Sequence, residues 1–531
     1  MRDHLRRSLA VLEASSLLAV ILYVTIVALS SGDLTFHDET AYLSRGLAIG
    51  DGEFPDFLNG AAYSQVYFVA SQLITDNANL YFCMRLISAQ ALVLGVWLAV
   101  RLVATPLIAW MTAALLSLLA LTYAWPGVSG PAGGLAALSV AIVMRWRTPG
   151  VFGIAAGLMW LASAFRPELV WFACLASVLA LARLLWPSAS SRSGESRFYS
   201  CSWGQTVSVL AGGLLVPSLL VAFYGSPFSS DSRSWVAFAQ HFSLRNAKGG
   251  EDPWLQASDI TSRFFGDATS VASAFFAAPA VFAKHMLENI VYSYKDLALA
   301  LGGTVDHPVS AGGVLVSAFG VVTLAVVFRR ILGRSRARTF PSVERVFVVA
   351  FTGGLLVALI APIVILYPRQ HYLVPLAAVM FVLGALMVTR DHRSDQISTI
   401  GAVAVLVVFS WTAILVAVSV SMGQADRKPL LQAVRQLQEL DQELVLLSED
   451  WGLDVYVPGM RLAPSFDPKL HKSLGEWIDA THTNVVLLND RLSMAPIAGA
   501  PDFDGFRDDP SSLGFVPLAQ GSNLWVRPPQ Q

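Results

Sequence analysis

Apolar runs long enough to cross a lipid bilayer recur along this chain of 531 residues. The hydrocarbon core of a bilayer is about 30 Å thick, and a helix needs roughly 20 apolar residues to cross it. Of all residues, 55% are hydrophobic and only 14% are charged. This composition and the repeated runs predict a polytopic α-helical membrane protein.

We expect about eleven transmembrane helices by the hydropathy criterion. The first run, Leu9 to Leu29, is longer than the apolar core of a removable signal peptide, so we interpret it as a retained span. The two short runs on either side of Phe165–Glu168 are the least distinct, because one kinked helix could replace them. The predicted spans lie near residues 9–30, 86–104, 106–125, 131–146, 150–165, 168–186, 205–224, 312–329, 346–366, 371–389 and 397–421.

Arginines indicate the orientation, because they gather on one side of the predicted spans. Cytoplasmic loops are the ones enriched in Lys and Arg. The N-terminus is therefore predicted to be cytoplasmic, and an odd number of spans places the C-terminus outside. The arginines concerned are Arg2, Arg6, Arg7, Arg145, Arg147, Arg192, Arg197, Arg329, Arg330, Arg334, Arg336, Arg338, Arg345, Arg390 and Arg393.

This orientation predicts a membrane domain, residues 1–421, with outer loops at about 31–85 and 226–311, and an extracytoplasmic tail, residues 422–531. In the second outer loop, residues 267–303 mix aromatic, apolar and charged side chains, as an interfacial amphipathic helix does. The tail is predicted to be a small α/β domain. It shows helical spacing at Leu430, Val434, Leu437 and Leu444, and strand-like runs at 454–459, 484–490 and 522–528.

The net charge and the cysteine positions argue against a nucleic-acid-binding protein, a disulfide-rich protein and a cysteine metal site. The net charge is -1, so no global field favours nucleic acid or an acidic partner. Cys83, Cys174 and Cys201 are scattered, with neither a disulfide framework nor metal-ligand spacing.

The first outer loop contains an unusual acidic pair, Asp38-Glu39, just beyond the first span. After it, Tyr42, Leu43, Leu47 and Ile49 recur at helical spacing up to the Gly50–Gly52 break, which predicts a short interfacial helix starting near Asp38. An acid there could simply cap the helix and complement its dipole. Alternatively, a carboxylate at the membrane surface could remove a proton from an acceptor hydroxyl.

The segment FHDETAYLSRGLAIGDGEFPDFLNG, residues 36–60, resembles the first outer loop of the GT-C superfamily of membrane glycosyltransferases. It is most similar to the branch of protein O-mannosyltransferases and lipid A aminoarabinose transferases. The segments GLMWLASAFRPELVWF (157–172) and YPRQHYLVPLAAVMF (367–381) also resemble elements of this superfamily. One difference is that residues 59–69 lack the Pro-Pro pair and basic residue that relatives often carry.

The resemblance implies an inverting transfer of a sugar from a polyprenyl-phosphate donor to a lipid, glycan or protein acceptor on the outer face. Asp38 would be the general base, and Glu39 would orient the acceptor or hold Asp38. This branch implies no metal cofactor, although more distant members of the superfamily use a divalent metal. A bacterial plasma membrane is the expected location.

The leaving phosphate needs cations near the lipid headgroups. Arg369 and His371 are the first candidates, followed by Arg85. Each has a structural alternative, since arginines at span ends often anchor the helix at the interface and a histidine beside aromatics often completes a hydrogen-bond set. Arg166 and Glu168 are expected to form an ion pair in a tight turn. Other basic residues could reach the phosphate if the second outer loop folds back over the membrane, namely His241, Lys284, His285 and Lys295.

Two other functions fit a multi-spanning chain. A transporter or lipid flippase usually carries ionisable residues within its spans, whereas these spans have almost none between their ends apart from Glu13. A glycan polymerase or ligase normally uses a diphosphate donor and a long, late outer loop. The acidic pair after the first span favours the glycosyltransferase.

Overall fold

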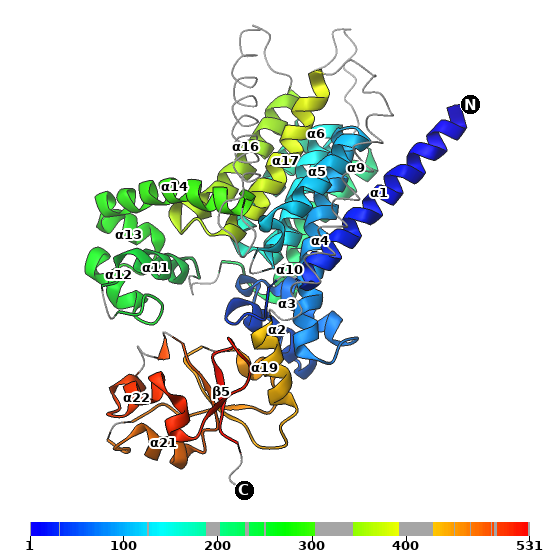
Figure 1. Cartoon of the computed structure of the whole chain (residues 1–531). Helices are drawn as coiled ribbons and strands as arrows, with labels where there is room; N and C mark the ends of the chain where they lie inside the picture. Colours follow the sequence, from blue (N-terminus) through cyan, green and yellow to red (C-terminus); the bar gives the residue numbers. More distant parts are fainter. Residues whose placement is uncertain are drawn as a thin grey trace, which may run out of the picture.

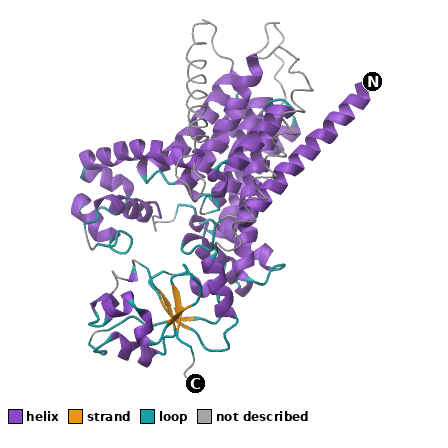
Figure 2. Ribbon diagram, in the orientation of Figure 1, coloured by secondary structure: helices purple, strands orange, loops and turns teal. Residues whose placement is uncertain are grey.

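A computed structural model of the chain describes residues 2–30, 32–124, 127–186, 202–228, 233–248, 251–302, 343–391, 428–450, 452–467, 469–489, 491–492 and 496–528. Most of these residues are helical, and the strands lie in the C-terminal part (Figure 2). Five helical segments are long and apolar enough to cross a membrane, which agrees with a multi-pass membrane protein. They are Glu13–Ser30, Asn77–Val103, Pro167–Leu185, Trp203–Tyr224 and Val343–Ile365.

Every predicted span within the described residues coincides with a helical segment. The spans predicted near 312–329 and 397–421 lie outside the described residues. The runs flanking Phe165–Glu168 are two helices, joined by the short turn η4 (Pro167–Leu169). The helical segments are α1 (Arg2–Ser30), α4 (Asn77–Val103), α5 (Pro106–Leu118), α6 (Ser129–Trp146), α7 (Pro149–Phe165), α8 (Val170–Leu185), α9 (Trp203–Leu210), η5 (Ala211–Leu215), α10 (Val216–Tyr224), α16 (Val343–Ile365) and α17 (Gln370–Asp391).

Small residues allow the membrane helices to approach closely. A Cβ on Gly95 of α4 would lie 2.6 Å from the Gly134 Cα of α6, and a Cβ on Gly212 of η5 would lie 1.8 Å from the Gly153 carbonyl oxygen of α7. In lipid, helices associate through van der Waals packing rather than the hydrophobic effect, so such contacts stabilise the bundle.

Two ion pairs join charged side chains near the ends of the described spans. Glu13 of α1 accepts from Arg101 of α4 at 2.7 Å, and Arg183 of α8 lies 3.5 Å from Glu344 of α16. Pairing removes much of the cost of placing these charges in or near lipid.

The two predicted outer loops fold into helices that extend from the bundle (Figure 1). The first contains α2 (Asp38–Ala48), η1 (Ile49–Asp51), η2 (Phe57–Asn59) and α3 (Ala61–Ser71). The second contains α11 (Arg233–Asn246), α12 (Ala257–Phe265), α13 (Val271–Ala277) and α14 (Pro279–Gly302). The segment predicted to be an interfacial helix contains two helices, α13 and α14. Phe276, Leu287 and Val291 of this pair are exposed, as an interfacial element requires.

Residues 428–528, here termed the C-terminal module, contain a five-stranded sheet in the order β2-β1-β3-β5-β4. Strands β2, β1 and β3 are parallel, whereas β5 is antiparallel to β3 and β4. The elements are α19 (Pro429–Gln438), β1 (Val445–Leu447), α20 (Leu453–Tyr456), β2 (Arg461–Leu462), α21 (Leu474–Thr481), β3 (Val485–Leu487), η8 (Pro496–Gly499), α22 (Phe503–Asp508), η9 (Pro510–Leu513), β4 (Val516–Pro517) and β5 (Leu524–Val526).

The strands predicted at 484–490 and 522–528 are confirmed as β3 and β5, and the helix carrying Leu430, Val434 and Leu437 is α19. The prediction that Leu444 continues this helix is wrong, because α19 ends at Gln438 and Leu444 directly precedes β1. The strand predicted at 454–459 is wrong, because this segment begins with the helical turn α20. The Asp454 carboxylate accepts from the Gly452 N–H, and the Tyr456 hydroxyl donates to the Thr35 carbonyl oxygen 2.7 Å away. A contact with a distant part of the chain therefore overrides the local strand pattern.

Candidate active site

The acidic pair occupies the first turn of α2, which begins at Asp38 as predicted. The residue in the N-cap position is His37, and it forms no side-chain cap. Asp38 is exposed, whereas Glu39 is only 2% exposed. Successive helical residues point in different directions, so the two carboxylates face different surroundings. Asp38 is the acid of the pair that a substrate can reach.

Glu39 is held by a buried hydrogen-bond network. One carboxylate oxygen accepts from the hydroxyls of Tyr63 and Tyr67 at 2.7 and 2.6 Å, and the other accepts from the Gly127 N–H at 3.1 Å. Burial raises the pKa of Glu39 to about 7, although these hydrogen bonds oppose the rise. The network ties α2 to α3 and to the chain just before α6. Of the two roles expected for Glu39, this geometry favours holding the helix that carries Asp38.

Tyr42 connects the Asp38 end of α2 to a cation, Arg233. The Arg233 guanidinium donates to the Tyr42 hydroxyl at 3.3 Å and also to the Leu58 carbonyl oxygen. Burial raises the pKa of Tyr42; Arg233 opposes this rise and the Asp38 carboxylate adds to it. Both charges are thus close enough to Tyr42 to influence its titration.

The turn between α7 and α8 supplies a paired cation. The Arg166 guanidinium donates to both oxygens of Glu168, at 3.2 and 3.3 Å, and to the Ser129 hydroxyl at 2.8 Å. It also lies 4.5 Å from the centre of the Tyr372 ring. The ion pair expected in this turn is confirmed.

Arg369 lies just before α17, and His371 is the second residue of this helix. The Arg369 guanidinium lies 4.9 Å from the centre of the Trp254 ring, and no described carboxylate is within ion-pairing distance of it. His371 is 6% exposed, and its ring lies 4.5 Å from that of Tyr372. Arg369 is therefore the better placed of the two to contact an anion.

The second outer loop folds back over the ends of α16 and α17. The His241 ring stacks on Tyr367 with centroids 5.4 Å apart, and one His285 ring nitrogen lies 3.1 Å from the Leu366 carbonyl oxygen. Burial, and next the charge of Arg369, lowers the pKa of His241 to about 3. Burial and Arg245 likewise lower the pKa of His285. These histidines are neutral at neutral pH, so the positive charge here comes from arginines.

Arg245, which the sequence analysis missed, lies between the rings of Tyr292 and Tyr367, 4.3 and 4.9 Å from their centres. Its two terminal guanidinium nitrogens are buried without a hydrogen-bond partner among the described residues, and the Glu288 carboxylate is 3.8 Å away. Arg245 follows His241 by four positions in α11, so helical spacing from a histidine already considered was the available signal.

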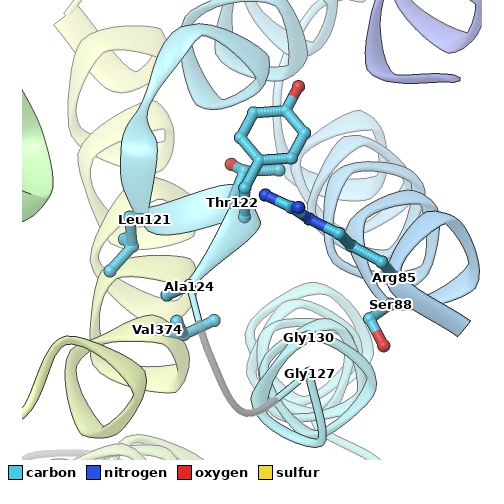
Figure 3. A pocket seen from close by; sticks show the side chains of 9 residues that line it. Arg85, Ser88, Leu121, Thr122, Ala124, Gly127, Gly130 and Val374 are labelled. Carbon is cyan, nitrogen blue, oxygen red and sulfur yellow. The ribbon is translucent and has the colours of Figure 1, made fainter. Parts of the chain in front are cut away.

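The remaining basic candidates are less suited to an anion. Lys284 is exposed and faces Glu288, away from the buried His285, as expected for adjacent helical residues. The side chain of Lys295 lies outside the described part. Arg85 is 3% exposed and reaches from α4 toward the turn at Thr122 (Figure 3). It lines a cavity of about 10 Å³, room for about one water molecule and too small for a phosphate group.

The described residues contain no group of three or more His, Cys, Asp or Glu side chains that could hold a metal ion.

No protein-family model matches the chain. No curated protein matches it.

Among solved structures, the fold is similar to that of an archaeal oligosaccharyltransferase, AglB from Archaeoglobus fulgidus, in complex with an inhibitory peptide and a dolichol-phosphate. The TM-score is 0.38 at 13% identity, and the match covers 89% of this chain and 69% of that one. It is also similar to ArnT from Cupriavidus metallidurans bound to undecaprenyl phosphate, with a TM-score of 0.35 at 12% identity over 97% and 98% of the two chains. TM-scores of this size carry no residue roles from either protein to this chain.

Proposed function

We propose that this protein is an inverting glycosyltransferase that moves a sugar from a polyprenyl-phosphate donor to an acceptor hydroxyl. The observation that carries the proposal is an exposed carboxylate, Asp38, together with arginines that donate no hydrogen bond to a carboxylate among the described residues. Arg233, Arg369 and Arg245 are these arginines. A base for the acceptor and cations for a leaving phosphate are the two requirements of this transfer.

The reaction proceeds in one displacement. Asp38 accepts the proton of the acceptor hydroxyl, and the acceptor oxygen forms a bond to the anomeric carbon of the sugar. The bond between that carbon and the phosphate oxygen breaks on the opposite side, so the configuration inverts. The electron pair leaves with the polyprenyl phosphate, whose charge the arginines stabilise through charge-assisted hydrogen bonds.

The apolar part of the donor suits a groove of about 350 Å³ between the first outer loop, α7 and α10. Its lining is almost entirely apolar, which fits a prenyl chain and not a free sugar. The lining residues are Phe54, Gln65, Leu161, Val216, Leu219, Leu220, Phe223 and Tyr224.

In this proposal the N-terminus is cytoplasmic, and Asp38 and the C-terminal module face the outside of a bacterial plasma membrane. A sugar already attached to polyprenyl phosphate needs no further energy source on that side. The acceptor is a lipid, a cell-wall glycan or a protein.

The test compares the masses of envelope glycans from cells that lack the gene and from cells complemented at matched membrane levels. Wild type is expected to restore a sugar increment, and Asp38→Asn is expected to lower the rate of transfer by about 10²- to 10⁴-fold, the range for loss of a general base. Asp51→Asn, which removes an exposed acid at the far end of the same helical segment, is the matched control and is expected to behave as wild type.

If Asp38→Asn restores the increment as well as wild type, Asp38 is not the base. If deletion changes no glycan, the glycosyltransferase proposal fails and transport becomes the better explanation.

A further inference from the structure

The C-terminal module contacts the first turn of α2, where Asp38 is located. Figure 1 shows the module at the same end of the molecule as α2, with α19 beside it. The Asp450 carboxylate oxygen is 3.1 Å from the His37 imidazole nitrogen. Gly452, two residues later, packs so closely on Thr40 that a Cβ would lie 2.1 Å from the Thr40 hydroxyl oxygen. The module thus contacts residues on both sides of the acidic pair.

His37 has an unusual backbone conformation, with φ 64° and ψ -119°. Residues other than glycine are rare at positive φ, and surrounding contacts must maintain such a conformation. The His37 carbonyl oxygen accepts from the Thr40 hydroxyl and from the Ala41 N–H, both at 2.9 Å. The conformation of His37 therefore sets the direction in which α2 starts, and with it the direction of the Asp38 side chain.

Asp450 is itself held in place from within the module. The Arg491 guanidinium lies 3.1 Å from the same oxygen that contacts His37, and the Asn489 side-chain amide donates to the other oxygen at 2.5 Å. Burial raises the pKa of Asp450, but the His37 and Arg491 contacts outweigh it and the net shift is downward. Asp450 is thus ionised and fixed beside the His37 imidazole.

The rest of the interface explains why this contact persists. The Asp33 carboxylate accepts from the N–H groups of Leu430 and Leu431 at the start of α19, at 2.6 and 2.9 Å. Arg435 of α19 donates to both oxygens of Asp76, at 2.6 and 2.9 Å. The module is therefore attached to the first outer loop at sites that do not involve His37.

We propose that the C-terminal module positions the general base: Asp450 acts through His37 to hold the first turn of α2 in the conformation that aims Asp38 at the acceptor. This inference rests on the proposed function. Asp450 is a positioning residue that acts through His37 and does not itself contact the substrate.

The experiment measures how fast the glycan increment returns after induction of full-length variants at matched membrane levels in cells lacking the gene. Asp450→Ala is expected to lower this rate by about 10- to 100-fold, the size expected when a reacting group is misplaced by about 1 Å. Asp450→Glu, which keeps the carboxylate, is expected to recover most of the rate. Asp479→Ala breaks an ion pair with Arg527 inside the module and is expected to leave the rate unchanged.

A double-mutant cycle tests whether Asp450 acts through His37. His37→Gly removes the imidazole and tolerates the positive φ, so it is expected to slow transfer as Asp450→Ala does. Adding Asp450→Ala to His37→Gly is expected to lower the transfer rate no further. Equal additional losses from the two substitutions would overturn the proposal.

Arg435→Gln separates positioning from attachment, because it weakens the interface away from His37. Protease resistance of the purified full-length proteins reports attachment of the module. A loss of rate in Arg435→Gln as large as in Asp450→Ala would show that attachment alone matters, and would refute the role of Asp450. If Asp450→Ala transfers sugar at the wild-type rate while Asp38→Asn is inactive, only the positioning role of Asp450 is refuted. If Asp38→Asn is active, the proposed function itself is refuted.

Discussion

Two polar regions of the loops that join the membrane helices differ in how completely their charges are paired. Around α2 and the turn between α7 and α8, Glu39 accepts three hydrogen bonds and Arg166 donates to Glu168 and Ser129. Around α11 and the start of α17, Arg369 and Arg245 lie against aromatic rings without a carboxylate within hydrogen-bond distance among the described residues. We term these the paired region and the unpaired region.

The difference indicates separate tasks. A buried polar group without a partner costs free energy, so proteins satisfy nearly all such groups unless a ligand does so. In the paired region Glu39, Arg166 and Glu168 hold the backbone, whereas Asp38 is exposed. In the unpaired region, positive charge and unused N–H donors are available for an anion such as a phosphate.

The largest effect on stability is expected from Arg166→Ala in the paired region. Without the guanidinium, Glu168 loses its bidentate partner in a half-buried turn, which should lower the free energy of unfolding by roughly 4 kcal/mol. Thermal unfolding of the detergent-solubilised protein measures this loss. Replacing both members of the pair, as in Arg166→Met with Glu168→Gln, is expected to lower the free energy of unfolding by less than Arg166→Ala does. Equal losses in the single and double variants would contradict the view that pairing stabilises this turn.

A pH dependence of stability is expected from Glu39. Its pKa is raised from 4.5 to about 7 in the folded protein. Between these values the folded chain keeps a proton that the unfolded chain has released. The free energy of unfolding should therefore decrease as the pH rises from about 4.5 to 7, by about 3 kcal/mol, and then level off. Unfolding midpoints across this range measure the slope, and Glu39→Gln is expected to flatten it. An unchanged slope in Glu39→Gln would assign the effect to another group.

The contrast between the two regions also shows what the sequence can and cannot predict. The start of α2 at Asp38 followed from local helical spacing, and the Arg166–Glu168 pair followed from adjacency in a turn. The burial of Glu39 could not be predicted from local sequence, because its tyrosine partners lie 24 and 28 positions further along the chain. The docking of Asp450 on His37 depends on contacts separated by hundreds of residues. Local patterns predict helices and turns, but which of two adjacent acids is exposed depends on the tertiary structure.

In the unpaired region, Arg369→Ala and Arg245→Ala are expected to weaken binding of undecaprenyl phosphate by about 10- to 100-fold each. A hydrogen bond to a charged group contributes about 1.5–3 kcal/mol, and each 1.4 kcal/mol is tenfold in affinity. The concentration dependence of thermal stabilisation by undecaprenyl phosphate in detergent measures the affinity. Because neither side chain donates a hydrogen bond to a described carboxylate, the stability of the unliganded protein should change much less than in Arg166→Ala. Unaltered affinity in both variants would remove the unpaired region as the phosphate site.

The smallest effect is expected from Lys284→Ala, on the exposed side of α14. Lys284 is adjacent to His285 in sequence, but its side chain is 78% exposed and lies 3.8 Å from Glu288. An exposed pair of this kind contributes little, so stability should stay within about 0.5 kcal/mol of wild type. Affinity for undecaprenyl phosphate should also be unchanged, in the same titration used for Arg245→Ala.

Lys284→Ala removes one positive charge from the second outer loop, as Arg245→Ala does. The two side chains differ in burial and in the direction in which they point. If both variants weaken binding equally, the attraction is a diffuse effect of net charge, and the burial of Arg245 has no functional meaning. If only Arg245→Ala does, the buried guanidinium with unused N–H donors is the feature that selects the phosphate.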